Sequence, residues 1–338
     1  MASTTIQVFR DVPALRHLRR QLLLAHRTVG FVPTMGALHE GHLSLIRLAA
    51  RDNTDVFVSI FVNPTQFGVN EDLDSYPRAW NSDVEKLGKL NQELSAHAKG
   101  RITAIFAPTP NVIYPALAPS SEVNGPGSFV TITPLSSKLE GASRPVFFRG
   151  VATVCMKLFN IVTADRVYFG QKDIQQTVVI KRMVRDFHVD TSVVIGPTVR
   201  DPDGLAMSSR NAYLGTRRRT VGLVLFHALK AAERAFTSGI YTRQDILGAA
   251  RLVTKNTLAE QEALPPSTRT LFEVDYISLA DPDTLDEVDV VDQSRGAILS
   301  GAVKMLPLEE SRPGGDGGLG NDEVPVRLID NIILGPIK

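Results

Sequence analysis

Short apolar runs alternate with helical patterns over the first two thirds of the chain. The apolar runs are typical of buried strands and lie at 29–32, 55–61, 103–106, 166–169 and 191–195. Segments with apolar positions at helical spacing lie at 42–51, 81–94, 148–162 and 174–187. This alternation predicts an α/β fold with a Rossmann-like, doubly wound parallel sheet, in which ligands bind at the carboxyl ends of the strands.

The remaining third of the chain has a different pattern. Two amphipathic helical patterns and two strand-like runs occupy 216–236, 242–261, 272–279 and 297–303. We therefore expect a ligand-binding domain over 1–198 and a smaller α/β (α+β) lid domain over 199–338. The polar segment 92–100 is expected to be a surface insertion, and the glycine-rich acidic segment 309–323 a mobile loop without chemistry.

Charge and composition exclude several classes of function. The 338 residues carry 37 Lys and Arg against 36 Asp and Glu, so the net charge of +1 gives no global field that would recruit nucleic acid or an anionic membrane. Cys155 is the single cysteine, which excludes an intrachain disulfide and a cysteine-based zinc site. No apolar run approaches the ~18 residues that a membrane span needs.

The N-terminal segment 10–27 has two interpretations. Its five arginines against one acid, Asp11, resemble a transit peptide. The spacing of its apolar residues instead predicts an amphipathic helix. The buried side of that helix would carry Val12, Leu15, Leu18, Leu22 and Leu23. We favour the helix, and a cytoplasmic protein, because the segment leads without a linker into the first predicted strand.

A first candidate site follows the apolar run 29–32 and reads Pro-Thr-Met-Gly-Ala-Leu-His-Glu-Gly-His at 33–42. A strand that turns through glycine into a helix directs backbone N–H groups and the positive end of the helix dipole at one point. His39 and His42 are three positions apart and can present imidazole donors on the same face. The pattern indicates contact with phosphate; zinc is the weaker alternative, because no third ligand lies nearby in sequence.

A second candidate site is Gly-Leu-Ala-Met-Ser-Ser-Arg-Asn at 204–211. Its two hydroxyls and one guanidinium, Ser208, Ser209 and Arg210, suit the β- and γ-phosphate oxygens of a nucleotide. Two phosphate-binding segments in one chain indicate nucleotidyl transfer rather than nucleotide binding alone. A domain hinge that closes would bring both segments to one nucleotide.

The segment 168–176 repeats the order of strand, glycine, polar residues and helix. Lys172 stands where its ammonium can reach a phosphate as a point charge. Asp173 has an alternative interpretation as a helix N-cap. Gln176 lies one turn later on the same face as Lys172.

Two further polar loops are less specific. Asn63 and Gln66, after a buried strand, suit the hydroxyls and carboxylate of a small substrate, but they equally suit a turn bonded to its own backbone. The loop 139–150 holds Arg144 and Arg149, which could clamp a carboxylate, bind a partner subunit or lie on the surface.

These segments together resemble the pantothenate synthetase (pantoate–β-alanine ligase) family, a branch of the nucleotidylyltransferase superfamily. The resemblance runs, in family order, through 33–42, 59–67, 76–78, 139–150, 169–176 and 203–214. It implies ATP-dependent condensation of pantoate with β-alanine through a pantoyl adenylate, with release of AMP and pyrophosphate. It also implies a homodimer, and Mg²⁺ that bridges the ATP phosphates without dedicated protein ligands.

The resemblance assigns roles to individual residues. The ATP site would comprise Met35, Gly36, His39, Gly41, His42, Gly170, Gln171, Lys172, Asp173, Val199, Met207, Ser208, Ser209 and Arg210. Catalysis would fall to His42, the nominal proton donor, with His39, Lys172, Ser208, Ser209 and Arg210. Pantoate and β-alanine would contact Asn63, Gln66, Tyr76, Arg144 and Gln176.

The sequence departs from the family pattern at two single positions and in the segments 92–100 and 309–323, which are expected to be insertions relative to the compact bacterial form. Phe147 stands where bacterial members commonly have histidine, so no substrate contact of that histidine is transferred to this chain. Residue 171 is Gln where many members have Glu. None of these departures affects the histidines or the Ser-Ser-Arg segment.

Other functions have specific arguments against them. A nucleotidylyltransferase with a phosphorylated acceptor would be expected to use arginines where Gln66 and Gln176 stand. A tRNA synthetase is disfavoured by the lack of a basic face and of an anticodon-binding domain. A regulatory module without turnover would not need the complete set of His39, His42 and Lys172 with the Ser-Ser-Arg segment.

Overall fold

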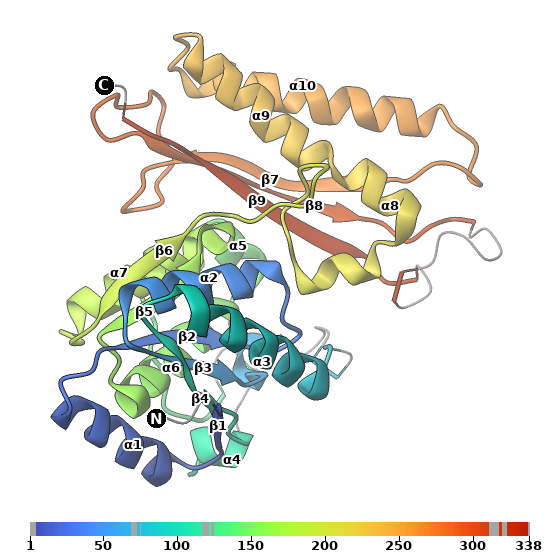
Figure 1. Cartoon of the computed structure of the whole chain (residues 1–338). Coiled ribbons are helices and arrows are strands. Elements are labelled where there is room, and N and C mark those ends of the chain that lie inside the picture. Colours follow the sequence, from blue (N-terminus) through green and yellow to red (C-terminus); the bar gives the residue numbers. More distant parts are fainter. Residues whose placement is uncertain are drawn as a thin grey trace. The chain divides into compact units, whose positions relative to one another are not determined.

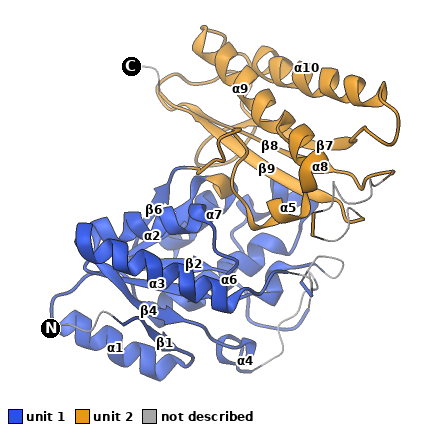
Figure 2. Ribbon diagram, turned by 45° about the vertical axis from the view of Figure 1, so that its right-hand side comes forward, with its two compact units in different colours: residues 1–171, 175–197 blue, residues 172–174, 198–338 orange. Residues whose placement is uncertain are grey.

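The computed structural model describes residues 5–336 except 69–72, 75, 117–121, 123–124, 311–317 and 320–322. The chain forms two compact units, shown in blue and orange in Figure 2. The first comprises 1–171 and 175–197, and the second comprises 172–174 and 198–338. Most of the predicted loop 309–323 lies outside the described residues.

The first unit contains a six-stranded sheet in which every neighbouring pair is parallel, in the order β1-β4-β3-β2-β5-β6 (Figure 1). The strands are β1 (Gln7–Phe9), β2 (Val29–Thr34), β3 (Asp55–Ile60), β4 (Arg101–Phe106), β5 (Arg166–Gly170) and β6 (Ser192–Gly196). The predicted parallel α/β sheet is therefore confirmed. From β2 the chain proceeds through β3 to β4 in one direction, whereas β5 and β6 extend the sheet in the other. The carboxyl ends of β2 and β5 thus flank a topological switch point, where such sheets bind ligands.

Helices and 3₁₀ turns connect these strands. The longer helices are α1 (Val12–Leu24), α2 (Glu40–Asp52), α3 (Trp80–His97), α6 (Phe147–Val162) and α7 (Ile174–Asp186). The short ones are η1 (Pro64–Gln66), α4 (Pro110–Ile113), η2 (Leu135–Ser137), α5 (Glu140–Ser143) and η3 (Gln171–Asp173). Apolar side chains of α2 and α3 form one core cluster with those of β2 to β5.

Two helices differ from the sequence expectations. The segment 92–100 lies mostly on the surface, as expected, but it continues α3 to His97 and buries Leu94; that it is an insertion stays a prediction. The predicted amphipathic helix at the N-terminus is present as α1, but Arg19 is buried and Leu23 is exposed. Arg19 takes a buried position because its guanidinium finds two acceptors there. It donates from Nε to the carbonyl of Thr163 (3.0 Å) and from Nη2 to Asp165 (3.2 Å).

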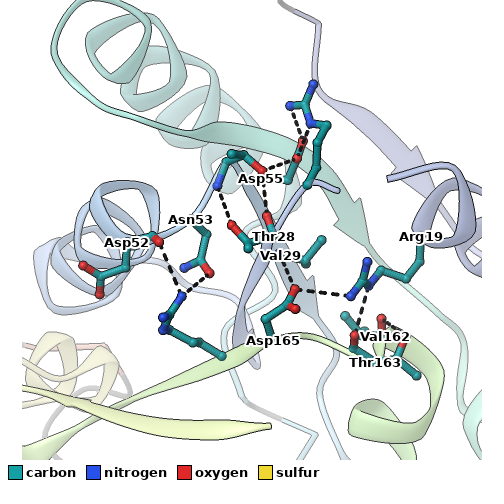
Figure 3. Close-up of polar contacts among 12 residues, drawn as sticks. Arg19, Thr28, Val29, Asp52, Asn53, Asp55, Val162, Thr163 and Asp165 are labelled. Atoms are coloured by element: carbon teal, nitrogen blue, oxygen red, sulfur yellow. Dashed lines mark hydrogen bonds and ion pairs between the residues drawn. The ribbon is translucent and has the colours of Figure 1, made fainter. Parts of the chain in front are cut away.

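Two carboxylates, of which Asp55 is fully buried and Asp165 partly exposed, hold the amino ends of the parallel strands together (Figure 3). Asp55, the fully buried first residue of β3, accepts from Nε (2.7 Å) and Nη2 (2.9 Å) of Arg27. It also accepts from the hydroxyl of Thr103 in β4, at 2.5 Å. Asp165, just before β5, accepts from the backbone N–H of Val29 in β2, at 2.7 Å. The polar groups at the amino ends of the strands bond one another, and they therefore stabilise the sheet.

The second unit contains an antiparallel sheet in the order β7-β8-β9. Its elements are η4 (Ser209–Tyr213), α8 (Gly215–Gly222), α9 (Val224–Thr237), α10 (Arg243–Glu262), β7 (Phe272–Ala280), β8 (Ala297–Met305) and β9 (Val326–Leu334). Apolar residues of α9, α10 and one sheet face form a single core. Strand β9 has no counterpart in the sequence prediction, and the helix predicted at 216–236 is divided into α8 and α9. Within the described part of the chain, no helix is both long and apolar enough to cross a membrane.

Replacing Asp55 with Ala should destabilise the first unit strongly. The substitution leaves Arg27 and Thr103 without their acceptor, and breaking a buried ion pair costs about 3 kcal/mol or more. Trp80, the single tryptophan, lies in α3, so urea unfolding followed by tryptophan fluorescence reports on this unit. Asp186→Ala, which removes an exposed carboxylate paired with Arg185, is the control and should change the unfolding free energy by less than about 0.5 kcal/mol. Equal unfolding midpoints for the two variants would contradict this role of Asp55.

Candidate active site

The chain turns between β2 and α2 through two successive residues with positive φ. Gly36 has φ +84° and Ala37 has φ +50°. The N–H of Gly36 donates to the hydroxyl of Thr34 (3.2 Å), and that hydroxyl donates to the carbonyl of Ser59 in β3 (2.7 Å). The turn is thereby tied to the carboxyl ends of both strands, and α2 begins directly after it.

His39 and His42 form a reciprocal cap at the start of α2. Nδ1 of His39 accepts from the N–H of Gly41 (3.2 Å), and the N–H of His39 donates to Nδ1 of His42 (3.4 Å). The two ring centroids are 4.2 Å apart. Since a backbone N–H can only donate, neither Nδ1 carries a proton in this geometry, and each neutral ring keeps its proton on Nε2. The start of α2 therefore offers two neutral imidazole donors beside the positive end of the helix dipole.

Asn63 is committed to its own loop. Its Nδ2 donates to Gln66 Oε1 (2.9 Å) and to the carbonyl of Gly150 (3.2 Å), and its Oδ1 accepts from Thr65 (3.1 Å) and Tyr114 (2.7 Å). Burial raises the pKa of Tyr114 to about 12, so its hydroxyl remains a donor at neutral pH. These bonds match the turn interpretation of Asn63, and its contact with substrate stays a prediction.

Gln66 keeps one polar group available. Its Oε1 is bonded to Asn63, whereas its Nε2 donates to none of the residues that the structure describes. Gln66 is only 8 % exposed. Gln66 is thus held in place with an amide donor uncommitted, as a substrate ligand requires. Tyr76, from the same predicted set, packs its ring edge on Phe67 with centroids 5.7 Å apart.

Arg144 is anchored on three sides. Its guanidinium bonds Glu140 Oε1 (3.1 Å) and the carbonyl of Gln66 (3.3 Å), and it lies over the ring of Phe147 at 3.9 Å. With 12 % of its side chain exposed, it does not lie on an open surface loop. Phe147 thus supports Arg144 at the position where the family pattern has histidine. The predicted contact of Arg144 with substrate remains untested.

Gln175 is a positioning residue that sequence reasoning missed. Its Oε1 accepts from the N–H of Glu140 (3.1 Å), and its Nε2 donates to the carbonyls of Leu135 (2.9 Å) and Lys138 (2.6 Å). It therefore fixes the loop that carries Arg144. The neighbouring Gln176 is partly exposed, and its side chain bonds none of the described residues. The only sequence signal for Gln175 is its place beside Gln176.

In the second unit, residues 199–207 form a tight hairpin. The N–H of Met207 donates to the carbonyl of Val199 (3.0 Å), so the two predicted ATP contacts lie side by side. The hairpin turns through Gly204, with φ +100°. Ser208 Oγ then accepts from the N–H of Arg210 (3.2 Å) and begins η4. The Ser-Ser-Arg segment is therefore a capped turn on a short hairpin.

Lys172 and Asp173 belong to the second compact unit. In the chain they follow Gly170, the last residue of β5, and Gln171. Nζ of Lys172 lies 3.6 Å from Oδ1 of Asp173. Asp173 accepts no backbone N–H among the described residues, so the alternative of a helix N-cap gains no support. The carbonyl of Lys172 accepts from Nδ2 of Asn331 in β9, at 2.9 Å.

A parallel α/β sheet with two imidazole donors at a helix N-terminus beside its switch point defines an α/β nucleotide-binding protein. The chain belongs to the pantoate-beta-alanine ligase family, whose model matches residues 7–333. The family resemblance found in the sequence is thereby confirmed.

Individual relatives agree with this assignment. A pantothenate synthetase of Roseiflexus castenholzii is 44 % identical over 325 residues, which cover 96 % of this chain and 99 % of the relative. The crystal structure of pantothenate synthetase from Thermus thermophilus has a TM-score of 0.74 and 34 % identity, covering 97 % of this chain and 99 % of that one. A pantoate-beta-alanine ligase from Francisella tularensis, complexed with beta-gamma ATP and beta-alanine, has a TM-score of 0.67 and 28 % identity, covering 98 % and 100 %.

Gly41→Ala should weaken ATP binding without weakening the fold. A Cβ at position 41 would lie 2.8 Å from Cε1 and 2.9 Å from Nδ1 of His39, so the imidazole must move. Alanine also favours a helix over glycine by roughly 0.5–1 kcal/mol. We expect an equal or higher melting temperature, with ATP binding measured by calorimetry about tenfold weaker, or ~1.4 kcal/mol.

Gly88→Ala is the matched control, because a Cβ at position 88 in α3 would meet nothing within 4 Å. It should stabilise the helix to a similar degree and leave the affinity for ATP unchanged. Wild-type affinity in Gly41→Ala would show that the orientation of His39 does not matter for the nucleotide.

Proposed function

We propose that this enzyme condenses pantoate with β-alanine to pantothenate through a pantoyl adenylate, with ATP cleaved to AMP and pyrophosphate. Family membership and the relative complexed with beta-gamma ATP and beta-alanine support the proposal. The observation that carries it in this chain is the pair of neutral Nε2 donors of His39 and His42 at the start of α2.

The reaction has two balanced steps. The pantoate carboxylate attacks the α-phosphorus of ATP, forming a P–O bond while the bond to pyrophosphate breaks. The amine of β-alanine then attacks the acyl carbon of the adenylate, forming the amide bond, losing a proton and releasing AMP. No covalent enzyme intermediate is needed, so the protein acts by positioning substrates and stabilising charge on the leaving pyrophosphate.

The proposed residue roles follow from this chemistry. His39 and His42 donate hydrogen bonds from Nε2 to phosphate oxygens; a neutral donor suffices, so His42 need not transfer its proton. The Nε2 of Gln66, together with Gln176, binds the uncharged and carboxylate groups of pantoate and β-alanine. Lys172 and the Ser-Ser-Arg segment supply further phosphate contacts.

Mg²⁺ fits the proposal as a partner of the nucleotide. No cluster of three His, Cys, Asp or Glu suited to a metal occurs among the described residues, so the ion would be held by phosphate oxygens and water. When bound, it would neutralise charge on the phosphates. The family resemblance also supports a homodimer in the cytoplasm and a lid role for the second unit, which we include in the proposal.

Product analysis tests the reaction directly. Purified protein with ATP, Mg²⁺ and pantoate should accumulate AMP and pyrophosphate in multiple turnovers only when β-alanine is added. A dinucleotide product with a phosphorylated acceptor would instead indicate another nucleotidylyltransferase. ATP-dependent thermal stabilisation without AMP would indicate a binding module.

Lys172→Ala should lower AMP formation by on the order of 10²-fold, comparable to the loss of one transition-state donor. Lys181→Ala is the control, because Lys181 is an exposed lysine on α7, the helix that follows Lys172 in the chain, and should leave the rate unchanged. Steady-state rates of AMP release measure both variants. A Lys172→Ala rate close to that of Lys181→Ala would remove Lys172 from the mechanism.

A further inference from the structure

Asp83, in the first turn of α3, places a fully buried carboxylate against the turn between β2 and α2. Its Oδ2 accepts from the N–H of Ala37 (2.9 Å), and its Oδ1 accepts from the N–H of Leu38 (2.7 Å). The positive N-terminal end of α3 further favours a negative charge at this position. Each carboxylate oxygen of Asp83 thus accepts a hydrogen bond from one of two consecutive backbone N–H groups.

Lys86 completes the contact from the next turn of α3. Its Nζ donates to the carbonyl of Leu38 at 2.6 Å. Together Asp83 and Lys86 bond two N–H groups and one carbonyl of the segment 37–38, and we call this arrangement the α3 clamp. The clamped segment ends one residue before His39, the N-cap of α2.

The α3 clamp holds a left-handed backbone conformation that is energetically unfavourable by itself. Ala37 is an L-residue in the left-handed region, which costs roughly 1–2 kcal/mol. A Cβ at Gly36 would lie 3.1 Å from Oδ2 of Asp83 and 3.2 Å from Ile60, so a side chain at position 36, already strained by φ +84°, would also push these neighbours aside. Two charge-assisted hydrogen bonds to Asp83 offset a cost of this size.

We propose that Asp83 is a positioning residue for the nucleotide site: it fixes the turn 36–38 and thereby the direction in which His39 and His42 present Nε2. The inference rests on the proposed function, because it assigns those donors to ATP phosphates. In this role Asp83 acts through the backbone N–H groups of Ala37 and Leu38, which both its oxygens bond, and not by direct contact with ATP or a metal. A shift of the donors by about 1 Å can cost on the order of 10²-fold in rate.

The test compares Asp83→Asn with Asp55→Asn, a second fully buried carboxylate at the opposite, amino edge of the sheet. Asparagine has the shape of aspartate but one acceptor, so its NH₂ would face the N–H of Ala37 or Leu38. We expect both variants to melt lower. Only Asp83→Asn should lose about 10²-fold in kcat/KM for ATP, together with the ATP-dependent rise in melting temperature.

Magnesium dependence separates positioning from direct metal binding. The Mg²⁺ concentration for half-maximal rate should be unchanged in Asp83→Asn, and a large increase would make Asp83 a metal ligand and overturn the proposal. Equal kcat/KM in Asp83→Asn and Asp55→Asn, measured below both melting temperatures, would reduce Asp83 to a structural role and also overturn it.

Lys86→Met provides a second variant if Asp83→Asn does not fold. It removes one bond of the α3 clamp and keeps the aliphatic packing, so kcat/KM for ATP should fall about tenfold with a folded protein. An unchanged value would contradict the role of the α3 clamp. Wild-type protein that binds ATP but forms no AMP would instead refute the proposed function, and the ATP-dependent melting shift of each variant would still test the α3 clamp.

Discussion

The left-handed turn between β2 and α2 is the constraint on which the candidate site depends. A strand that leads directly into a helix must reverse its direction within a few residues, and here Gly36 and Ala37 do so with positive φ. The N–H of Gly36 bonds Thr34 within β2, but the N–H groups of Ala37 and Leu38 need acceptors from elsewhere. Asp83 provides two acceptor oxygens from a helix that begins more than forty residues later. The position of the two histidines is therefore a property of the tertiary fold, although the motif that contains them is local.

The polar groups at the two edges of the parallel sheet obtain their hydrogen-bond partners in different ways. At the amino edge, Asp55 and Asp165 bond arginines, a hydroxyl and a backbone N–H, so that the chain itself compensates their charges. At the carboxyl edge, His39, His42 and Gln66 carry donors on Nε2, which we propose bind a polyanionic nucleotide and a carboxylate substrate. Stability and function are thus divided between opposite ends of the same strands, as is usual for parallel sheets.

Much of the fold and part of the site could be predicted from the sequence because their signals are local. Five of the six parallel strands are continuous apolar runs, and the histidine turn has its own glycines and capping pattern. The three residues of β1 are too few for a periodic signal. Asp83 and Gln175 escaped notice because a polar residue on a helix resembles a solvated position. Their partners are backbone groups at least 35 residues away, which no local pattern contains.

Strand β9 shows the same limit in the second unit. Its sequence alternation is broken by Asp330 and Asn331, which argues against a buried strand when the strand is considered alone. Asp330 is paired through both oxygens with Arg200, at 2.5 and 2.9 Å, and so anchors the hairpin that carries the Ser-Ser-Arg segment. Asn331, which points to the other face of the sheet, bonds the carbonyl of Lys172. Asp330 and Asn331, which make β9 hard to predict from the sequence, therefore anchor both predicted phosphate-binding elements of this unit. A strand with only apolar residues at these two positions would be easier to predict and would lack both anchors.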